Sequence, residues 1–161
     1  MTDLTQRHDD TEWLLMGPSR PLAMRVTEAD THGHYSVGEQ ILPPKALVMP
    51  HVHSTHDQLK IILRGTCGIY LDGVVTIAPA GTISFGPRGL VHALWNAGTE
   101  ECVFLELTSP GGFEDYFKDF ALIASNLDAS PELRAQLGER YGITILPEIA
   151  AQLSESYGLS L

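Results

Sequence analysis

Between about residue 20 and residue 108, apolar and polar positions alternate in short runs separated by turn-forming residues. Runs of this length, bounded by Gly, Pro, Asn and Asp, are typical of β-strands. The clearest turn is Asp72-Gly73, which predicts a two-residue hairpin. The expected strands are 22–26, 35–42, 47–53, 58–63, 67–71, 74–77, 91–95 and 102–108. Many short strands at regular spacing predict a mainly β sandwich or small barrel.

After residue 108 the pattern changes to helical spacing. Apolar residues recur every three or four positions through 113–126 and 131–140, and a third short segment of this kind covers 148–157. We therefore expect a helical C-terminal extension over residues 109–161. Structural cover is the favoured role for these helices, ahead of a lid over a site or a contact with a second subunit.

The N-terminal end of the chain is polar and acidic through residue 10, which predicts a loose tail. Residues 13–16 have the composition of a short edge strand. A chain of 161 residues has the size of a single domain, so we expect one domain over 1–161 with its barrel core over 20–108.

The formal net charge of −10 argues against a nucleic-acid partner or an anionic membrane surface. No apolar run reaches membrane-spanning length, and the first residues lack the pattern of a secretion signal. Cys67 and Cys102 lie on separate expected strands and form no disulfide framework. We interpret both as small core residues, and we expect a cytoplasmic protein.

The most informative stretch is 50–65, which contains two histidines two residues apart. Because residues i and i+2 of a strand point to the same face, His51 and His53 project into one space. Two imidazoles on a strand favour a first-row transition-metal site. Gln58 joins that space only if residues 54–57 turn or bulge and so reset the alternation. The alternative interpretation is a set of satisfied core histidines.

A second stretch, 81–96, contains His92 among Gly, Pro and Asn residues. Together the two stretches resemble the paired motifs of the cupin superfamily, which are H-x-H followed by an acid and a Gly, and then G-x5-P-x-G-x2-H-x3-N. Gln58 stands where most cupins carry Glu. The matching positions are His51, His53, Gly65, Gly81, Pro87, Gly89, His92 and Asn96. The resemblance implies a cupin double-stranded β-helix, a jelly-roll barrel, with short C-terminal helices.

The resemblance also implies one divalent transition metal per chain, held by His51, His53, Gln58 and His92. Fe, Ni, Mn, Cu and Zn all accept such ligands, and the sequence does not choose among them. Four protein ligands would leave one or two positions open, as a catalytic site requires. Because all four ligands are uncharged, the metal would keep its full charge and act as a strong Lewis acid.

The resemblance implies a Glu at position 58 as the base of a quercetin-type dioxygenase, so the Gln found there requires another base. Lys60 lies two residues after Gln58 and is expected to face the same cavity, or else to extend to the barrel mouth. His56 is either a general base or a solvent-facing loop residue. Glu106, in an apolar strand, is expected to pair with Lys60 or to face outward.

The segment 110–114, Pro-Gly-Gly-Phe-Glu, resembles the tail of quercetin-dioxygenase-like cupins. This resemblance favours a dioxygenase that acts on a small enolisable or phenolic substrate, flavonol-like or diketone-like, chelated at the metal. The first alternative is a non-redox isomerase, polyketide cyclase or uronate-processing enzyme, and the second is a small-molecule binding module. Exposed sheet edges lead us to expect a homodimer.

Overall fold

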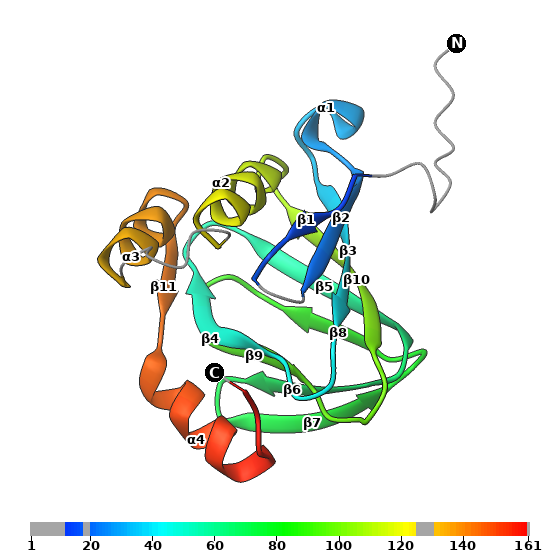
Figure 1. Ribbon diagram of the computed structural model, residues 1–161. Helices are drawn as coiled ribbons and strands as arrows, with labels where there is room; N and C mark the ends of the chain where they lie inside the picture. Colours follow the sequence, from blue (N-terminus) through cyan, green and yellow to red (C-terminus); the bar gives the residue numbers. More distant parts are fainter. Residues whose placement is uncertain (1–11, 18–19, 125–130, 161) are drawn as a thin grey trace.

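The computed structural model describes residues 12–17, 20–124 and 131–160. Two antiparallel sheets face each other and form a barrel, with helices along one side (Figure 1). The predicted mainly β jelly roll with short C-terminal helices is therefore confirmed. The first sheet has the order β1 (Leu14–Leu15), β2 (Pro21–Val26), β3 (Ser36–Leu42), β10 (Cys102–Ser109), β5 (Asp57–Arg64) and β8 (Ile83–Gly86). The second has the order β11 (Ile143–Ile145), β4 (Leu47–His53), β9 (His92–Asn96), β6 (Thr66–Leu71) and β7 (Val74–Pro79).

The inner face of the first sheet changes from polar to apolar along the barrel. In β5, Gln58, Lys60 and Ile62 are buried, whereas the residues between them face outward and are more exposed. The register with β10 sets Gln58 opposite Thr108, Lys60 opposite Glu106 and Ile62 opposite Phe104. The period of two in each strand directs every second residue inward, and the order of these residues gives the barrel one polar end and one apolar end.

The apolar end is closed by a core that includes both cysteines. Cys67 and Cys102 are free thiols and fully buried, which agrees with their interpretation as core residues. The core at this end consists of Leu42, Ile62, Cys67, Ile69, Ala78, Leu94, Cys102 and Phe104.

The C-terminal extension contains the three predicted helices, α2 (Glu114–Ala124), α3 (Pro131–Arg140) and α4 (Pro147–Tyr157). It also contains the short strand β11 (Ile143–Ile145), which the sequence patterns did not indicate. β11 pairs with the edge of β4, with Ile143 opposite His53 and Ile145 opposite His51. A three-residue strand has no periodicity of its own, and its partner strand lies some 90 positions earlier in the chain. The remaining short helix is α1 (Glu28–Thr31).

α4 covers the outer side of the second sheet. The indole of Trp95 is fully buried and lies 4.7 Å from the ring of Tyr157, centroid to centroid. Trp95 therefore packs against α4. Gly68, on the neighbouring strand β6, leaves the space that this indole occupies.

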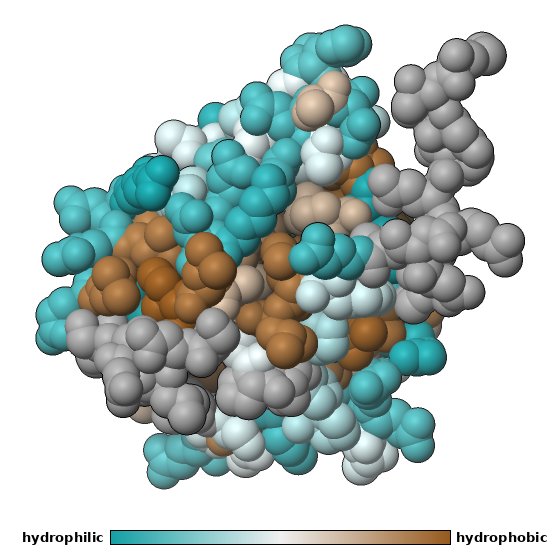
Figure 2. Space-filling view, turned by 45° about the horizontal axis from the view of Figure 1, so that its top comes forward, coloured by the Kyte–Doolittle hydropathy of each residue, from teal (hydrophilic) through white to brown (hydrophobic). Residues whose placement is uncertain are grey.

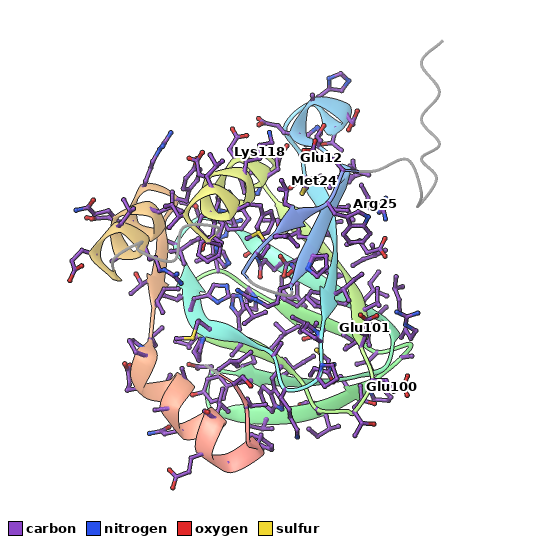
Figure 3. All side chains as sticks on the ribbon, in the orientation of Figure 1. Glu12, Met24, Arg25, Glu100, Glu101 and Lys118 are labelled. Carbon is purple, nitrogen blue, oxygen red and sulfur yellow. The ribbon has the colours of Figure 1, made fainter. Side chains whose placement is uncertain are left out.

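The surface of the protein carries both apolar and acidic regions. Apolar surface gathers over α2 and α3 (Figure 2), where Leu122 and Leu133 are exposed. Acidic residues such as Glu100 and Glu101 lie at the end of the barrel away from α2 (Figure 3). Further exposed apolar residues lie on β7 and β8, which are each one of the two edge strands of their sheets. The homodimer and the cytoplasmic location stay predictions.

The N-terminal segment and the possibility of a membrane-spanning helix were also considered in the sequence. The loose tail over residues 1–10 lies outside the described residues, whereas the edge strand expected over 13–16 is β1. Within the part of the chain that the structure describes, no helix is both long and apolar enough to cross a membrane.

We predict that Gly68→Ala destabilises the fold strongly, because the added Cβ would overlap the buried indole of Trp95. Overpacking of this kind costs about 3 kcal/mol of unfolding free energy, measured by urea denaturation. Gly38→Ala is the matched control, because a Cβ there makes only ordinary contacts, the nearest at 3.7 Å. Equal stability of the two variants would contradict the packing described for Trp95.

Candidate metal centre

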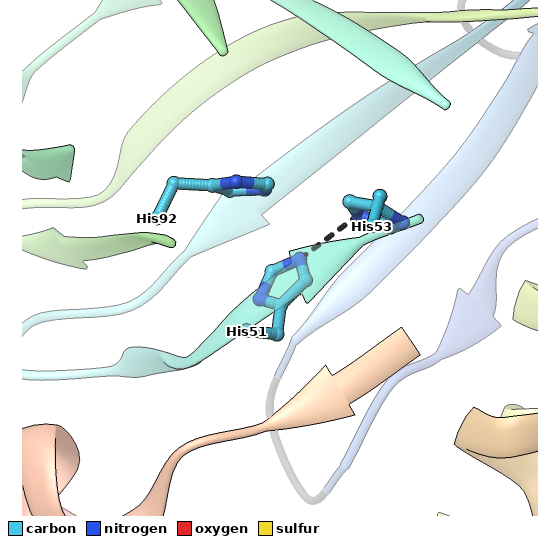
Figure 4. Close-up of side chains that lie close together, drawn as sticks. All are labelled: His51, His53 and His92. Carbon is cyan, nitrogen blue, oxygen red and sulfur yellow. Dashed lines mark hydrogen bonds between the residues drawn. The ribbon is translucent and has the colours of Figure 1, made fainter. Parts of the chain in front are cut away.

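Three imidazoles converge at the polar end of the barrel (Figure 4). His51 and His53 come from β4, and His92 comes from the neighbouring strand β9, where it lies opposite His51. The ring centroid of His51 is 4.8 Å from that of His53 and 4.3 Å from that of His92. One ligand atom from each ring lies within 4.8 Å of the others, so the three histidines could hold one metal ion.

Backbone carbonyls orient two of the rings. The Nδ1 atom of His51 lies 2.7 Å from the carbonyl oxygen of Met49, and the Nδ1 of His92 lies 3.2 Å from that of Leu90. A carbonyl can only accept, so each Nδ1 carries the proton and leaves Nε2 with a lone pair for a metal. The Nε2 atoms of His51 and His53 lie 3.1 Å apart, whereas the buried Nδ1 of His53 has no hydrogen-bond partner among the described residues.

Burial keeps these histidines neutral. It lowers the pKa of His51 to about 4 and that of His53 to about 2, and it lowers the pKa of His92 further. The charge of Lys60 acts in the same direction on all three pKa values. Metal ligation requires unprotonated imidazole, so the cluster is in the correct protonation state at neutral pH.

Gln58 reaches the cluster from the opposite sheet. The turn after His53 carries the chain from β4 to β5, so a crossing between sheets resets the alternation, with no bulge within one strand. The Oε1 atom of Gln58 lies 2.9 Å from Nε2 of His92, and it accepts a 2.7 Å hydrogen bond from Nζ of Lys60. An ammonium can only donate, so Lys60 fixes the amide with its oxygen toward the histidines.

Lys60 and Glu106 form the ion pair that the sequence suggested. Their Nζ and Oε2 atoms are 3.3 Å apart, and both side chains are buried. The other carboxylate oxygen, Oε1, accepts a hydrogen bond of 3.1 Å from Nε2 of Gln40. Both oxygens of Glu106 are thus engaged. Gln40 was not among the sequence candidates, although the alternation through 35–42 places it on the same face as Leu42.

His56 lies at the rim, outside the cluster of three. Its ring centroid is 6.2 Å from that of His53, and its Nδ1 lies 2.9 Å from Oγ1 of Thr55. The side chain is half-buried, and burial lowers its pKa. Phe113, just before α2, packs its ring 4.9 Å from His53 and 5.0 Å from His56. The start of the C-terminal extension therefore forms a wall of the site, beyond the structural cover expected for it.

An exposed ion pair anchors the two loops around the site. The carboxylate of Asp57 accepts hydrogen bonds from the backbone N–H and the guanidinium of Arg88, at 2.7–3.0 Å. These bonds hold the pKa of Asp57 at about 2. The N–H of Gly89 donates to the carbonyl of His53 at 2.8 Å. These bonds tie the loop before β9 to the turn after β4, next to the strands that carry the three histidines.

Comparisons with known proteins agree with this fold. Residues 38–108 match the family described as Cupin domain. Solved structures with the same fold include KdgF from a Halomonas species, with a TM-score of 0.60 and 16% identity over 68% of this chain and 94% of that one. An RmlC-like cupin from Shewanella frigidimarina has a TM-score of 0.60 and 17% identity over 71% and 96%. The polyketide cyclase RemF from Streptomyces resistomycificus has a TM-score of 0.59 and 20% identity over 68% and 80%.

The protein therefore has the cupin fold with a candidate three-histidine metal centre, and the matches support its place in the cupin superfamily. No protein of curated function is significantly similar to the chain in sequence. Several structural neighbours are enzymes by name, but identities of this size show only the shared fold. The match to the tail of quercetin-dioxygenase-like cupins stays a prediction.

We predict that His92→Ala reduces the metal content of the purified protein to near zero, whereas Gln58→Glu retains it. A carboxylate at position 58 would keep an oxygen ligand and would lie beside Lys60. Elemental analysis per chain is the measurement, with His56→Ala as a control that retains metal. If Gln58→Glu lost metal as completely as His92→Ala, the assignment of residue 58 as a ligand would be wrong.

Acid should destabilise the metal-free protein. The folded-state pKa values of the three histidines lie below the ordinary value of 6.5, so below that pH the unfolded chain binds protons that the folded chain excludes. The contribution of the three histidines to the free energy of unfolding is fully present above pH 6.5. Below that pH, each histidine lowers this free energy by up to about 1.4 kcal/mol for every pH unit. Urea unfolding of chelator-treated protein between pH 7 and 5 measures this slope. His53→Gln should reduce the slope, and an unchanged slope would contradict the burial of a neutral His53.

Proposed function

We propose that the protein is a mononuclear metal-dependent enzyme that acts on a small organic molecule bound to the metal through oxygen. The observation that carries this proposal is the convergence of three neutral imidazoles on one point inside a barrel mouth. Buried imidazoles with low pKa values and no carboxylate partner are costly as core residues, whereas they suit a ligand set for a divalent transition metal.

Within this class, the site best supports non-redox chemistry such as isomerisation, cyclisation or hydration. A bound metal would supply Lewis acidity toward an enolate or a carbonyl oxygen. Gln58 is neutral, and the carboxylate of Glu106 is held by Lys60 and Gln40. No free carboxylate therefore faces the histidines among the described residues. The fold of a polyketide cyclase, RemF, is one of the similar structures.

In this proposal, the residues around the histidines have distinct roles. The three histidines and Gln58 would hold the metal, and Lys60 orients the amide of Gln58 by its hydrogen bond. The ring of Phe113 excludes water from one side of His53. His56 is the proton carrier, because its Nδ1 is engaged by Thr55 and its Nε2 remains for a proton at the rim.

A dioxygenase is the second candidate, and the position of Phe113 favours it. The run Pro-Gly-Gly-Phe at 110–113, which suggested the quercetin-dioxygenase-like tail, ends at a ring that lies against His53. In that case the substrate would be enolisable or phenolic, as the sequence predicts. A binding module without turnover is the third candidate.

Elemental analysis followed by oxygen uptake separates these functions. The panel consists of flavonols, diketones and unsaturated uronates, incubated with protein loaded with Zn, Fe, Ni, Mn or Cu. The proposal expects conversion of a panel member by the Zn form without oxygen consumption, and loss of conversion in His92→Ala. Oxygen uptake that requires a redox-active metal would support the dioxygenase. Recovery of every bound compound unchanged would reject both enzymes.

A further inference from the structure

Arg20 is a cation at the barrel mouth that the sequence patterns did not single out. It directly precedes β2, and it closes the hairpin to β1 in two ways. Its carbonyl accepts a hydrogen bond from the N–H of Met16 at 2.8 Å, and its Nη2 donates to the carbonyl of Met16 at 2.6 Å. The second bond uses one guanidinium N–H, and a guanidinium has five. The hairpin thus fixes the side chain of Arg20 and leaves most of its N–H donors available to a ligand.

This hairpin lies at the rim of the candidate metal centre. Met16 and Leu22, on either side of the turn, belong to one apolar cluster with Phe113, Phe117 and Ile143. Phe113 contacts the ring of His53, and Ile143 pairs with His53 across the sheet. In Figure 1, β1 and β2 lie beside α2 at this end of the barrel. Arg20 is therefore held within the wall that surrounds the histidines.

The charge of Arg20 has no counterion among the described residues. Within the part of the chain that the structure describes, the guanidinium donates one hydrogen bond, to the carbonyl of Met16, and takes part in no ion pair. Four other arginines are each paired with a carboxylate, namely Arg25 with Glu39, Arg64 with Glu101, Arg88 with Asp57 and Arg140 with Asp119. Burial lowers the pKa of Arg20, yet a guanidinium remains charged at neutral pH.

The charge of Arg20 acts on groups of the same region. Its positive charge lowers the pKa of His51 on β4 and opposes the rise in the pKa of Tyr116 on α2. Inside the barrel, Lys60 is neutralised by Glu106. Counting only the residues that the structure describes, the mouth thus carries an uncompensated positive charge, although the chain as a whole has a net charge of −10.

We propose that Arg20 binds a carboxylate group of an anionic substrate whose other oxygen atoms reach the three-histidine centre. A guanidinium matches a carboxylate by two parallel N–H···O bonds, which fixes orientation as well as charge. Arg20 is then a specificity-determining residue that selects acids over neutral molecules of the same shape. This inference rests on the proposed function, because it requires a metal at the histidines.

Two matched pairs of probes test this inference on the intact, metal-loaded protein. The compounds 2-oxoglutarate and 2-oxopentanoate share a chelating 2-oxo acid and differ in one distal carboxylate, and so do 2-oxoadipate and 2-oxohexanoate. Dissociation constants come from titration of the Co(II)-loaded protein by its visible absorption. We expect wild type to prefer one of the two diacids over its monoacid by about tenfold. Arg20→Gln should abolish that preference, and Arg20→Lys should restore part of it.

Two further arginines provide the controls. Arg64→Gln removes a positive charge at the far end of the barrel, beside Glu101 (Figure 3), and should leave the preference unchanged. Arg134→Gln removes an exposed charge near Arg20, and loss of the preference in this variant alone would overturn the assignment. Absence of any preference in metal-loaded wild type, or its persistence in Arg20→Gln, also overturns it. A wild type that holds no metal overturns the proposed function and this inference together.

Discussion

The close packing of three uncharged imidazoles in the barrel mouth is the constraint on which the rest of the site depends. Neutral rings can approach until two Nε2 atoms are 3.1 Å apart, whereas protonated rings would repel. The fold keeps them neutral by burial and orients two of them through backbone carbonyls. Oriented in this way, the ring nitrogens turn their lone pairs toward a common point, which is what a divalent metal requires.

The polar inner face of β5 and β10 complements this cluster in charge. Lys60 would be costly to bury alone, and Glu106 removes that cost by pairing with it. Lys60 can then donate to the oxygen of Gln58. A glutamate at position 58 would add a second carboxylate beside the same lysine. Because Glu106 already balances the charge of Lys60, the neutral amide of Gln58 adds no unpaired charge to the barrel.

The C-terminal extension takes part in the site as well as covering the barrel. β11 completes the sheet next to the histidine strand, which protects an edge that would otherwise be open. The residues before α2 bring Phe113 onto His53, and the buried carboxylate of Glu114 accepts bonds from the N–H groups of Glu28 and Gly112. The N-terminal hairpin, with Arg20, packs on the same segment. The β1–β2 hairpin and the first part of the C-terminal extension therefore meet at the mouth of the barrel.

Much of this could be predicted from the sequence, because it depends on local spacing. The i, i+2 relation put His51 and His53 on one face, Asp72-Gly73 set the hairpin between β6 and β7, and helical spacing located α2, α3 and α4. The same alternation directed Lys60 inward. What the sequence determined by itself was therefore the strand faces, the turns and the chemical types available at the mouth.

Beyond the ligand set that the cupin motifs implied and the suggested Lys60–Glu106 pair, tertiary structure decided which groups meet and how. Gln58 faces His92 because the chain crosses to the other sheet, and Gln40 meets Glu106 because β3 pairs with β10. β11 has too few residues for a periodicity and exists through its pairing with β4. Arg20 has no motif, and its place beside the site follows from packing of the β1–β2 hairpin against α2. Contacts between distant segments depend on register and packing, which no local pattern of residues specifies.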